Sequence, residues 1–490
     1  MAELIRNYVG GQWVGAQDGA TFETFNPATE AVIAPAAKSS ADDVKAAVAA
    51  AKTAYADWRL MPAPRRGEIL YQVARLLEER KEHLSRVMTQ EMGKVLSEAR
   101  GDVQEAIDMA YYMGGEGRRL QGYTAPVEMP DKFGMALRDS VGVIGLITPW
   151  NFPTAVPSWK MLPALVAGNT IVFKPSEEVP CVSAEFVRVF EDAGLPPGVL
   201  NIVQGAGDAG AALVSEPDVR VISFTGSNET GLKVYAQAAA LGKKVSLEMG
   251  GKNAIIVMDD ANLDLAIQAI TWSAYGTTGQ RCTATSRLIV HRDIKPKLVE
   301  ALVEQARQLK VGDGLDEAVE VGPLVNQKAL DKVERYIEIG KQEGAQIVVG
   351  GGRPDFDKGF YYLPTLFADV SPEMRIAREE IFGPVLSMIE VGSLEEAVEV
   401  NNSVVYGLSS SIFTENVNAA FRAIRDLTTG IVYINHGTTG AEIHFPFGGT
   451  RGTGNGMREA GQAGLDAFTE WKAVYVDYSG RLQRAQIDNR

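Results

Sequence analysis

One thiol and one carboxylate stand out in this 490-residue sequence as a pair that could do covalent chemistry. Cys282 lies in YGTTGQRCTATSR (275–287), where small and polar residues would let a substrate approach the sulfur closely. Glu248 lies 282 − 248 = 34 residues upstream, in VSLEMGGKN (245–253). A sulfur nucleophile forms a covalent intermediate, and a carboxylate can activate the water that hydrolyses it. On composition alone, however, a lone cysteine is more often a small apolar core residue.

Two glycine-containing segments could bind the pyrophosphate of a nucleotide. ISFTGSNETG (222–231) carries Gly226 and Ser227 where a predicted strand meets a helix, and the free N–H groups of a first helical turn bind phosphate. GAGDAG (205–210) also follows a predicted strand and matches the dinucleotide pattern G-x-G-x-x-G. Because glycines also serve ordinary turns, the pattern alone does not decide between them.

A lysine and a glutamate follow another predicted strand, in KPSE (174–177). Lys174 and Glu177 could hydrogen-bond the two hydroxyls of a ribose. The carboxylate of Glu177 would repel a 2′-phosphate, which favours NAD over NADP. Each of these side chains could instead be a solvated surface charge.

Composition excludes several other classes of protein. Hydrophobic residues make up 46% and charged residues 22% of the chain, which is typical of a soluble globular protein. The formal net charge of −14 disfavours nucleic acid and anionic membranes as partners. Two cysteines argue against a disulfide framework and favour a reducing compartment. Neither a signal peptide nor an apolar run of about 18 residues is evident, so we expect a cytoplasmic protein.

The order of predicted elements indicates an α/β fold. Short strands and turns at 7–36 precede a mostly helical region that begins after Ser40. From Val141, apolar β-branched runs alternate with helical segments, a pattern typical of an open, doubly wound parallel sheet. A second such series begins near Lys252. Residues 121–139 and 473–476 are predicted to form strands outside both sheets, where exposed edges commonly pair subunits.

Taken together, the chain resembles the aldehyde dehydrogenase superfamily over essentially its whole length. The resemblance favours the nucleophile role for Cys282 and places the pyrophosphate at the FTGS turn, which leaves GAGDAG as a structural turn. The motifs are closest to those of semialdehyde dehydrogenases. In chain order they are PWNFP (149–153), WKMLPAL (159–165), GNTIVFKPSE (168–177), FTGS (224–227), LEMGGKN (247–253), GQRCT (279–283), EEIFGP (379–384) and PFGG (446–449).

The resemblance implies three parts. We expect a Rossmann-like NAD-binding domain from residues 1–120 and 141–251, and an α/β catalytic domain from 252–450. Residues 121–140 and 451–490 would form a small β oligomerisation element and a C-terminal tail. Members of the superfamily usually assemble as homodimers or homotetramers.

The resemblance also assigns the catalytic roles. Cys282 would attack the aldehyde carbon, and the side-chain amide of Asn151 would stabilise the resulting oxyanion beside the Cys282 N–H. Glu248 would act as general base for the water that hydrolyses the thioester. Lys160 and Glu459 resemble residues that pass that proton to solvent, although either could be an ordinary surface charge.

The expected cofactor is NAD, with NADP possible. Glu380 resembles a residue that hydrogen-bonds the nicotinamide ribose, and Phe382 one that packs beside the nicotinamide ring. Gly250 would let the backbone pass close to the nicotinamide. The rest of the cofactor would be held by Trp150, Lys174, Glu177, Gly226 and Ser227. No metal is expected, because the four histidines are scattered, and Cys181 is predicted to be a core residue.

The substrate is open at this point. The motifs look like those of α-ketoglutaric semialdehyde dehydrogenases, whereas TTGAEI (438–443) is similar to a loop of α-aminoadipic semialdehyde dehydrogenases. A broad-specificity aldehyde dehydrogenase is a further alternative. Arg281 could grip a distal carboxylate or instead form an ordinary salt bridge. A coenzyme A-acylating enzyme is disfavoured because Glu248 is present, and a non-catalytic scaffold because both Cys282 and Glu248 are present.

Overall fold

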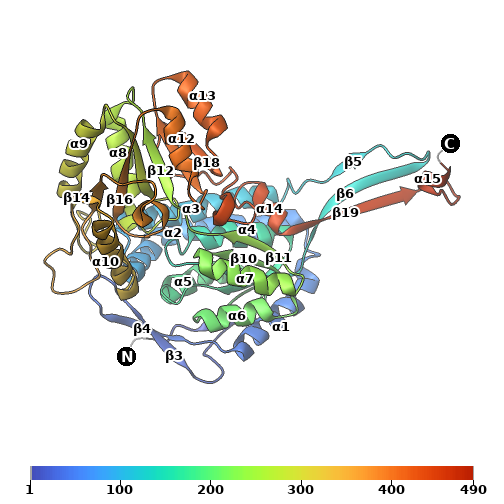
Figure 1. Cartoon of the computed structure of the whole chain (residues 1–490). Coiled ribbons are helices and arrows are strands. Elements are labelled where there is room, and N and C mark those ends of the chain that lie inside the picture. Colours follow the sequence, from blue (N-terminus) through green and yellow to red (C-terminus); the bar gives the residue numbers. More distant parts are fainter. Residues whose placement is uncertain (1–2, 489–490) are drawn as a thin grey trace.

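The structure is a computed structural model that describes residues 3–488. It contains two seven-stranded sheets with helices packed on their faces, and a three-stranded sheet that projects from the body as an arm (Figure 1). The predicted α/β architecture is therefore confirmed. Within residues 3–488, no helix is both long and apolar enough to span a membrane.

The first sheet is the doubly wound sheet predicted for the first half of the chain. In spatial order the strands are β11 (Lys244–Glu248), β10 (Val219–Thr225), β7 (Val143–Ile147), β8 (Thr170–Lys174), β9 (Leu200–Ile202), β1 (Asn7–Val9) and β2 (Gln12–Val14). Five neighbouring strands, from β11 at one edge to β9, are parallel, and an N-terminal hairpin joins β9 in the antiparallel direction. The helices of this half are α1 (Ala41–Trp58), α2 (Ala63–Met92), α3 (Leu96–Glu116), α4 (Ala155–Ala167), α5 (Pro180–Asp192), α6 (Gly207–Ser215) and α7 (Asn228–Ala240).

The second sheet is also parallel, apart from one antiparallel edge strand, β14. In spatial order its strands are β14 (Gln346–Val349), β15 (Thr365–Ala368), β16 (Val385–Val391), β13 (Thr285–His291), β12 (Asn253–Val257), β17 (Ser409–Phe413) and β18 (Ile431–Ile434). The helices of this part are α8 (Leu263–Tyr275), α9 (Lys295–Gln308), α10 (Gln327–Gln342), α11 (Arg375–Arg378), α12 (Leu394–Asn402) and α13 (Val417–Asp426).

Both sheets have strands that are buried on both faces, as parallel sheets covered by helices require. Every residue of β7, β8 and β12 is buried. The polar side chains that follow such strands therefore gather at the carboxyl edge of each sheet, where ligands bind in α/β folds.

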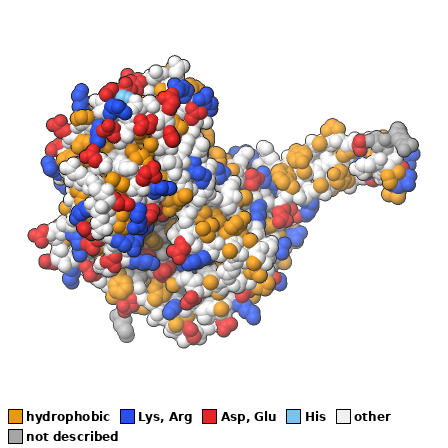
Figure 2. Space-filling view, viewed as in Figure 1, with side chains coloured by type: hydrophobic (Ala, Val, Ile, Leu, Met, Phe, Trp, Pro, Cys, Tyr) orange, Lys and Arg blue, Asp and Glu red, His pale blue; other side chains and the backbone are white. Residues whose placement is uncertain are grey.

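The arm consists of β5 (Tyr123–Ala125), β6 (Lys132–Ser140) and β19 (Thr469–Asp477), in the order β19-β6-β5. All of its strand pairs are antiparallel, and they lie outside both large sheets as predicted. Apolar side chains are exposed along it, including Trp471 and Tyr475, and Figure 2 shows hydrophobic groups along its length. The chain then ends at the tip of the arm with α15 (Ala485–Asp488) (Figure 1). A separate two-stranded sheet, β3 (Thr21–Phe25) and β4 (Val32–Ala37), lies near the N-terminus.

Candidate active site

The half-buried side chain of Cys282 lines two cavities of about 720 Å³ and 340 Å³. Val156, Thr225 and Met249 also line both, so the two cavities meet around the thiol. A group bound in one cavity and a group bound in the other can therefore both reach the sulfur.

The larger cavity collects every residue that the sequence predicts for cofactor binding. Ser227 is the N-cap of α7, and its hydroxyl accepts a hydrogen bond from the N–H of Thr230 at 3.3 Å. Lys174 Nζ lies 3.5 Å from Glu177 Oε2, at the end of β8, and burial lowers the pKa of Lys174. The predicted residues in its wall are Trp150, Lys174, Glu177, Gly226, Ser227, Gly250, Glu380 and Phe382, with Asn151 from the catalytic set.

Glu380 lies directly against the backbone that follows β11. Its Oε1 accepts a hydrogen bond from the Gly251 N–H at 2.9 Å, and burial raises the pKa of its carboxyl. A Cβ at Gly250 would lie 2.3 Å from Glu380 Oε2, so any side chain there would displace the carboxylate. Phe382 packs edge-to-face on Trp150, with ring centroids 5.7 Å apart.

The GAGDAG segment reaches the larger cavity as well. Gly207 and Gly210 line that cavity, at the start of α6. The interpretation of this segment as a structural turn stays a prediction.

The smaller cavity holds Glu248 and Glu459 among aromatic rings, with Trp159 packed on Phe447 at a centroid distance of 4.7 Å. Glu248 is 3% exposed, and neither of its carboxylate oxygens has a hydrogen-bond partner among the described residues. Burial, and next the charge of Glu459, raise the pKa of Glu248 well above its ordinary value. A carboxyl with a raised pKa and free oxygens is suited to accept a proton from water.

Lys160 and Glu459 are buried together beneath this cavity and are not surface charges. Lys160 Nζ donates a hydrogen bond to Glu459 Oε1 and another, at 3.1 Å, to the hydroxyl of Ser223. The Ser223 hydroxyl in turn lies 3.5 Å from Glu459 Oε1. Ser223 belongs to β10, one residue before the FTGS motif, and neither its type nor its spacing predicts a role for it.

Two asparagines hold the backbone on either side of the thiol. Asn151 donates from Nδ2 to the Gln280 carbonyl at 3.0 Å, which leaves its second N–H for the cavity that it lines. Asn253 donates to the Cys282 carbonyl at 2.7 Å. Asn253 is the last residue of the LEMGGKN motif, but the motif alone does not predict that its side chain binds the backbone at Cys282. Burial, and next the charge of Glu248, raise the pKa of the Cys282 thiol to about 12.

Arg281 forms a salt bridge within the protein, which is one of the two roles considered from the sequence. Its guanidinium lies 3.0 Å from Glu98 Oε1 and stacks over the ring of Trp272 at 4.4 Å. It nevertheless lines the smaller cavity, together with Glu98 and Glu105 of α3. A distal group of a bound substrate would therefore reach this ion pair.

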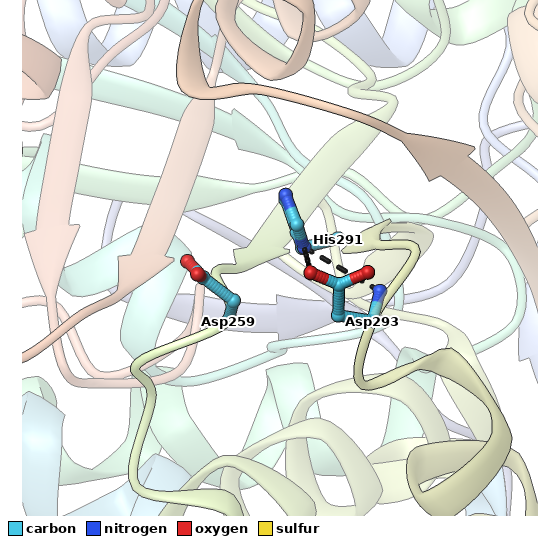
Figure 3. Close-up of side chains that lie close together, drawn as sticks. All are labelled: Asp259, His291 and Asp293. Carbon is cyan, nitrogen blue, oxygen red and sulfur yellow. Dashed lines mark hydrogen bonds and ion pairs between the residues drawn. The ribbon is translucent and has the colours of Figure 1, made fainter.

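Away from both cavities, one group within residues 3–488 has the composition of a metal site. Figure 3 shows Asp259, His291 and Asp293, whose possible ligand atoms lie within 4.8 Å of one another, near the ends of β12 and β13. His291 Nε2 already lies 3.2 Å from the Gly392 carbonyl, and Asp259 and Asp293 are exposed. The absence of a resident metal stays a prediction. Cys181 is buried at the start of α5 and lines neither cavity.

A doubly wound sheet with a cavity at the carboxyl ends of its strands, and a thiol that shares a second cavity with a buried carboxylate, are together typical of an oxidoreductase that binds a dinucleotide. The chain belongs to the aldehyde dehydrogenase family, whose model matches residues 13–474. It oxidises an aldehyde to the carboxylate with reduction of NAD.

Curated relatives and solved structures agree with this assignment. The α-ketoglutaric semialdehyde dehydrogenase of Bacillus subtilis is 43% identical over 96% of this chain and 97% of its own length. The α-ketoglutarate semialdehyde dehydrogenase of Haloferax volcanii is 44% identical over 98% and 100%. The structure of an NAD-dependent aldehyde dehydrogenase from Sinorhizobium meliloti superposes with a TM-score of 0.96, at 37% identity over 99% of this chain and 97% of that one. Betaine aldehyde dehydrogenase from Staphylococcus aureus, in complex with NAD+, gives a TM-score of 0.95 at 33% identity, over 98% and 96%.

Proposed function

We propose that Cys282 is the nucleophile and Glu248 the general base of this oxidation. The position of Cys282 in the wall of both cavities carries the proposal. Cys282 adds as the thiolate to the aldehyde carbon, and the second N–H of Asn151 donates to the oxyanion that forms. As the oxyanion reforms a carbonyl, the aldehyde hydrogen leaves as hydride and a thioester remains on Cys282. Water adds to that thioester while Glu248 takes its proton, and the thiolate departs.

The buried cluster beside Glu248 supports a route for that proton. Lys160, Ser223 and Glu459 are joined by hydrogen bonds, and the charges of Lys160 and Glu459 act on the pKa of Glu248. A proton taken from water by Glu248 can pass to this cluster while the carboxylate returns to its basic form.

The residues of the larger cavity fit NAD, which accepts the hydride when bound. The N-terminus of α7, capped by Ser227, offers N–H groups to a pyrophosphate. Lys174 and Glu177 are placed for ribose hydroxyls, and Glu177 is partly exposed, so its charge disfavours a 2′-phosphate. Glu380 and Phe382 flank the path to Cys282. NADP use is a weaker alternative.

For the substrate we propose an acid semialdehyde, in the class of α-ketoglutaric semialdehyde. Arg281 offers a guanidinium to a distal carboxylate, and the Thr439 hydroxyl in the same wall has no partner among residues 3–488. Burial, and next the charge of Asp102, raise the pKa of Glu105 to about 8, so at neutral pH its carboxyl can also donate a hydrogen bond. The α-ketoglutaric semialdehyde dehydrogenases of Bacillus subtilis and Haloferax volcanii, to which this chain is similar, support this class.

The test compares kcat/KM for acid semialdehydes of increasing length with kcat/KM for neutral aldehydes of matched length. A preference of about tenfold or more for the acid is expected, since one charge-assisted hydrogen bond contributes about 1.5–3 kcal/mol. Equal values would favour a broad-specificity enzyme, and a preference for the 2-amino acid would favour the α-aminoadipic alternative. Cys282→Ala should abolish NADH production with every aldehyde. If turnover depended on coenzyme A, the thiol of coenzyme A, and not water, would accept the acyl group from the thioester.

We further propose a homo-oligomer in a reducing, cytoplasmic compartment. The arm exposes apolar side chains on both faces, which a second copy of the chain would cover. Two free cysteines agree with a reducing compartment. The domain boundaries are also a proposal. The NAD-binding domain comprises residues 1–120 and 141–251, the catalytic domain 252–450, and the oligomerisation element with the C-terminal tail 121–140 and 451–490.

A further inference from the structure

The turn that leads to Cys282 has an unusual backbone. Thr277, Thr278 and Gly279 all have positive φ, at 48°, 57° and 68°. A β-branched residue rarely adopts this left-handed conformation, and two in succession are rarer still. Such a turn persists only where its surroundings hold it in place.

A carboxylate from a distant part of the chain holds this turn. Glu98, on α3, accepts hydrogen bonds from the Thr277 N–H at 2.8 Å and 3.0 Å and from the Thr277 hydroxyl at 2.5 Å. It also pairs with Arg281, whose Nε donates to Thr277 Oγ1 at 3.0 Å. Glu98 thus contacts the first left-handed residue and the residue immediately before Cys282.

The backbone and the ion pair lie close together at this contact. A Cβ at Gly276 would lie 2.7 Å from Arg281 Nη2 and 3.0 Å from Glu98 Oε1. Both partners of the ion pair are buried, with side-chain exposures of 6% for Arg281 and 4% for Glu98. On the other side of the turn, the Thr278 hydroxyl donates to the Gly322 carbonyl at 2.9 Å. The turn is therefore held from α3 on one side and from the second half of the chain on the other.

We propose that Glu98 is a positioning residue, which holds the left-handed turn and thereby directs the Cys282 sulfur to the junction of the two cavities. The proposal rests on the nucleophile role of Cys282. Glu98 acts through geometry, because the charges that raise the thiol pKa are those of Glu248 and Glu380. A misplaced sulfur reacts more slowly at every pH, whereas a changed thiol pKa would shift the pH at which it reacts.

The test measures alkylation of Cys282 by iodoacetamide across pH, together with the single-turnover burst of NADH. Glu98→Ala should lower the limiting alkylation rate and the burst rate by about tenfold or more, with the midpoint pH unchanged. Glu98→Gln retains an acceptor for Thr277 and should stay within about threefold of the native rates. The matched control is Asp108→Ala, which removes an exposed carboxylate of α3 that bonds Gln104 and does not contact the turn.

A second substitution separates positioning from loss of stability. Glycine adopts positive φ readily, so Thr277→Gly should recover most of the rate that Glu98→Ala loses when the two are combined. Unchanged alkylation in Glu98→Ala, a shifted midpoint at an unchanged limiting rate, or no recovery in the double variant would each overturn the inference. If Cys282→Ala still produced NADH, the proposed function would fail instead. The two failures are therefore distinguishable.

Discussion

Lys160 and Glu459 act on Glu248 with opposite signs although they are bonded to each other. The charge of Glu459 raises the pKa of Glu248, and the charge of Lys160 lowers it. Glu248 is a base only above its own pKa, so thioester hydrolysis should increase as pH rises through that value. Lys160→Met should therefore move this rise to higher pH, and Glu459→Gln should move it to lower pH. Single-turnover hydrolysis of the thioester, followed from pH 5 to about pH 10, measures both shifts.

The double variant is the control for that pair. Lys160→Met with Glu459→Gln removes both charges and should return the profile close to that of the native enzyme. Breaking only one side of a buried pair costs about 3–5 kcal/mol of stability, so each profile is recorded well below the melting temperature of its variant. Shifts in the same direction for both single variants would contradict the assigned signs.

Glu105 connects substrate choice to pH. Its pKa is raised to about 8, so below that pH the carboxyl is protonated and can donate a hydrogen bond to a substrate carboxylate. Above it the carboxylate is charged and repels the same group. KM for an acid semialdehyde should therefore rise by several-fold between about pH 7 and pH 9, while KM for a neutral aldehyde stays constant. In Glu105→Gln the amide donates at every pH, so KM for the acid semialdehyde should change little with pH. If KM of the native enzyme did not change with pH, the role of Glu105 would be refuted.

At the scale of elements, the sequence predicts the site best where a residue follows its own strand. Ser227 and Lys174 could be placed because each follows a buried β-branched run, and such runs end at one sheet edge. Residues that contact an element distant in the sequence could not be placed in this way. Glu98 lies 179 positions from the turn that it holds, and Ser223 is one of two small polar residues in its strand. The strand β15 was also missed, because TLFA is only four residues long and follows a proline.

The connection between β11 and β12 gives a test at this scale. Gly250 has no room for a side chain, because a Cβ would lie within 2.5 Å of the whole Glu380 carboxyl group. Gly250→Ala should displace Glu380 and weaken NAD binding by about tenfold, measured by quenching of protein fluorescence. Alkylation of Cys282 should be little affected. Gly352→Ala is the control, since a Cβ there meets no atom within 4 Å and its φ is not positive. Equal affinities in the two variants would contradict the role of Glu380.

At the scale of the whole molecule, both cavities are lined by residues of the body and by none of β5, β6 or β19, whereas the arm exposes apolar groups. A sheet with apolar groups exposed on both faces leaves them in contact with water unless another surface covers them. Trp471 and Tyr475 are 54% and 70% exposed on one face, and Phe133 and Val476 are 44% and 46% exposed on the other. Alternation along β19 places Tyr475 and Val476 on opposite faces. A second copy that covers only one face would leave the other in contact with water.

Charges on the arm should therefore dissociate the assembly without destroying the cavities. Tyr475→Lys combined with Val476→Lys should reduce the sedimentation coefficient to that of a monomer at micromolar concentration, because a charge buried in an apolar interface costs several kcal/mol. NAD binding should persist, since the strands of the arm contribute no residue to the lining of the larger cavity. Leu60→Lys is the matched control, because Leu60 is 71% exposed on the body and lies outside the arm. A variant that sediments like the native protein would show that the arm does not hold the subunits together.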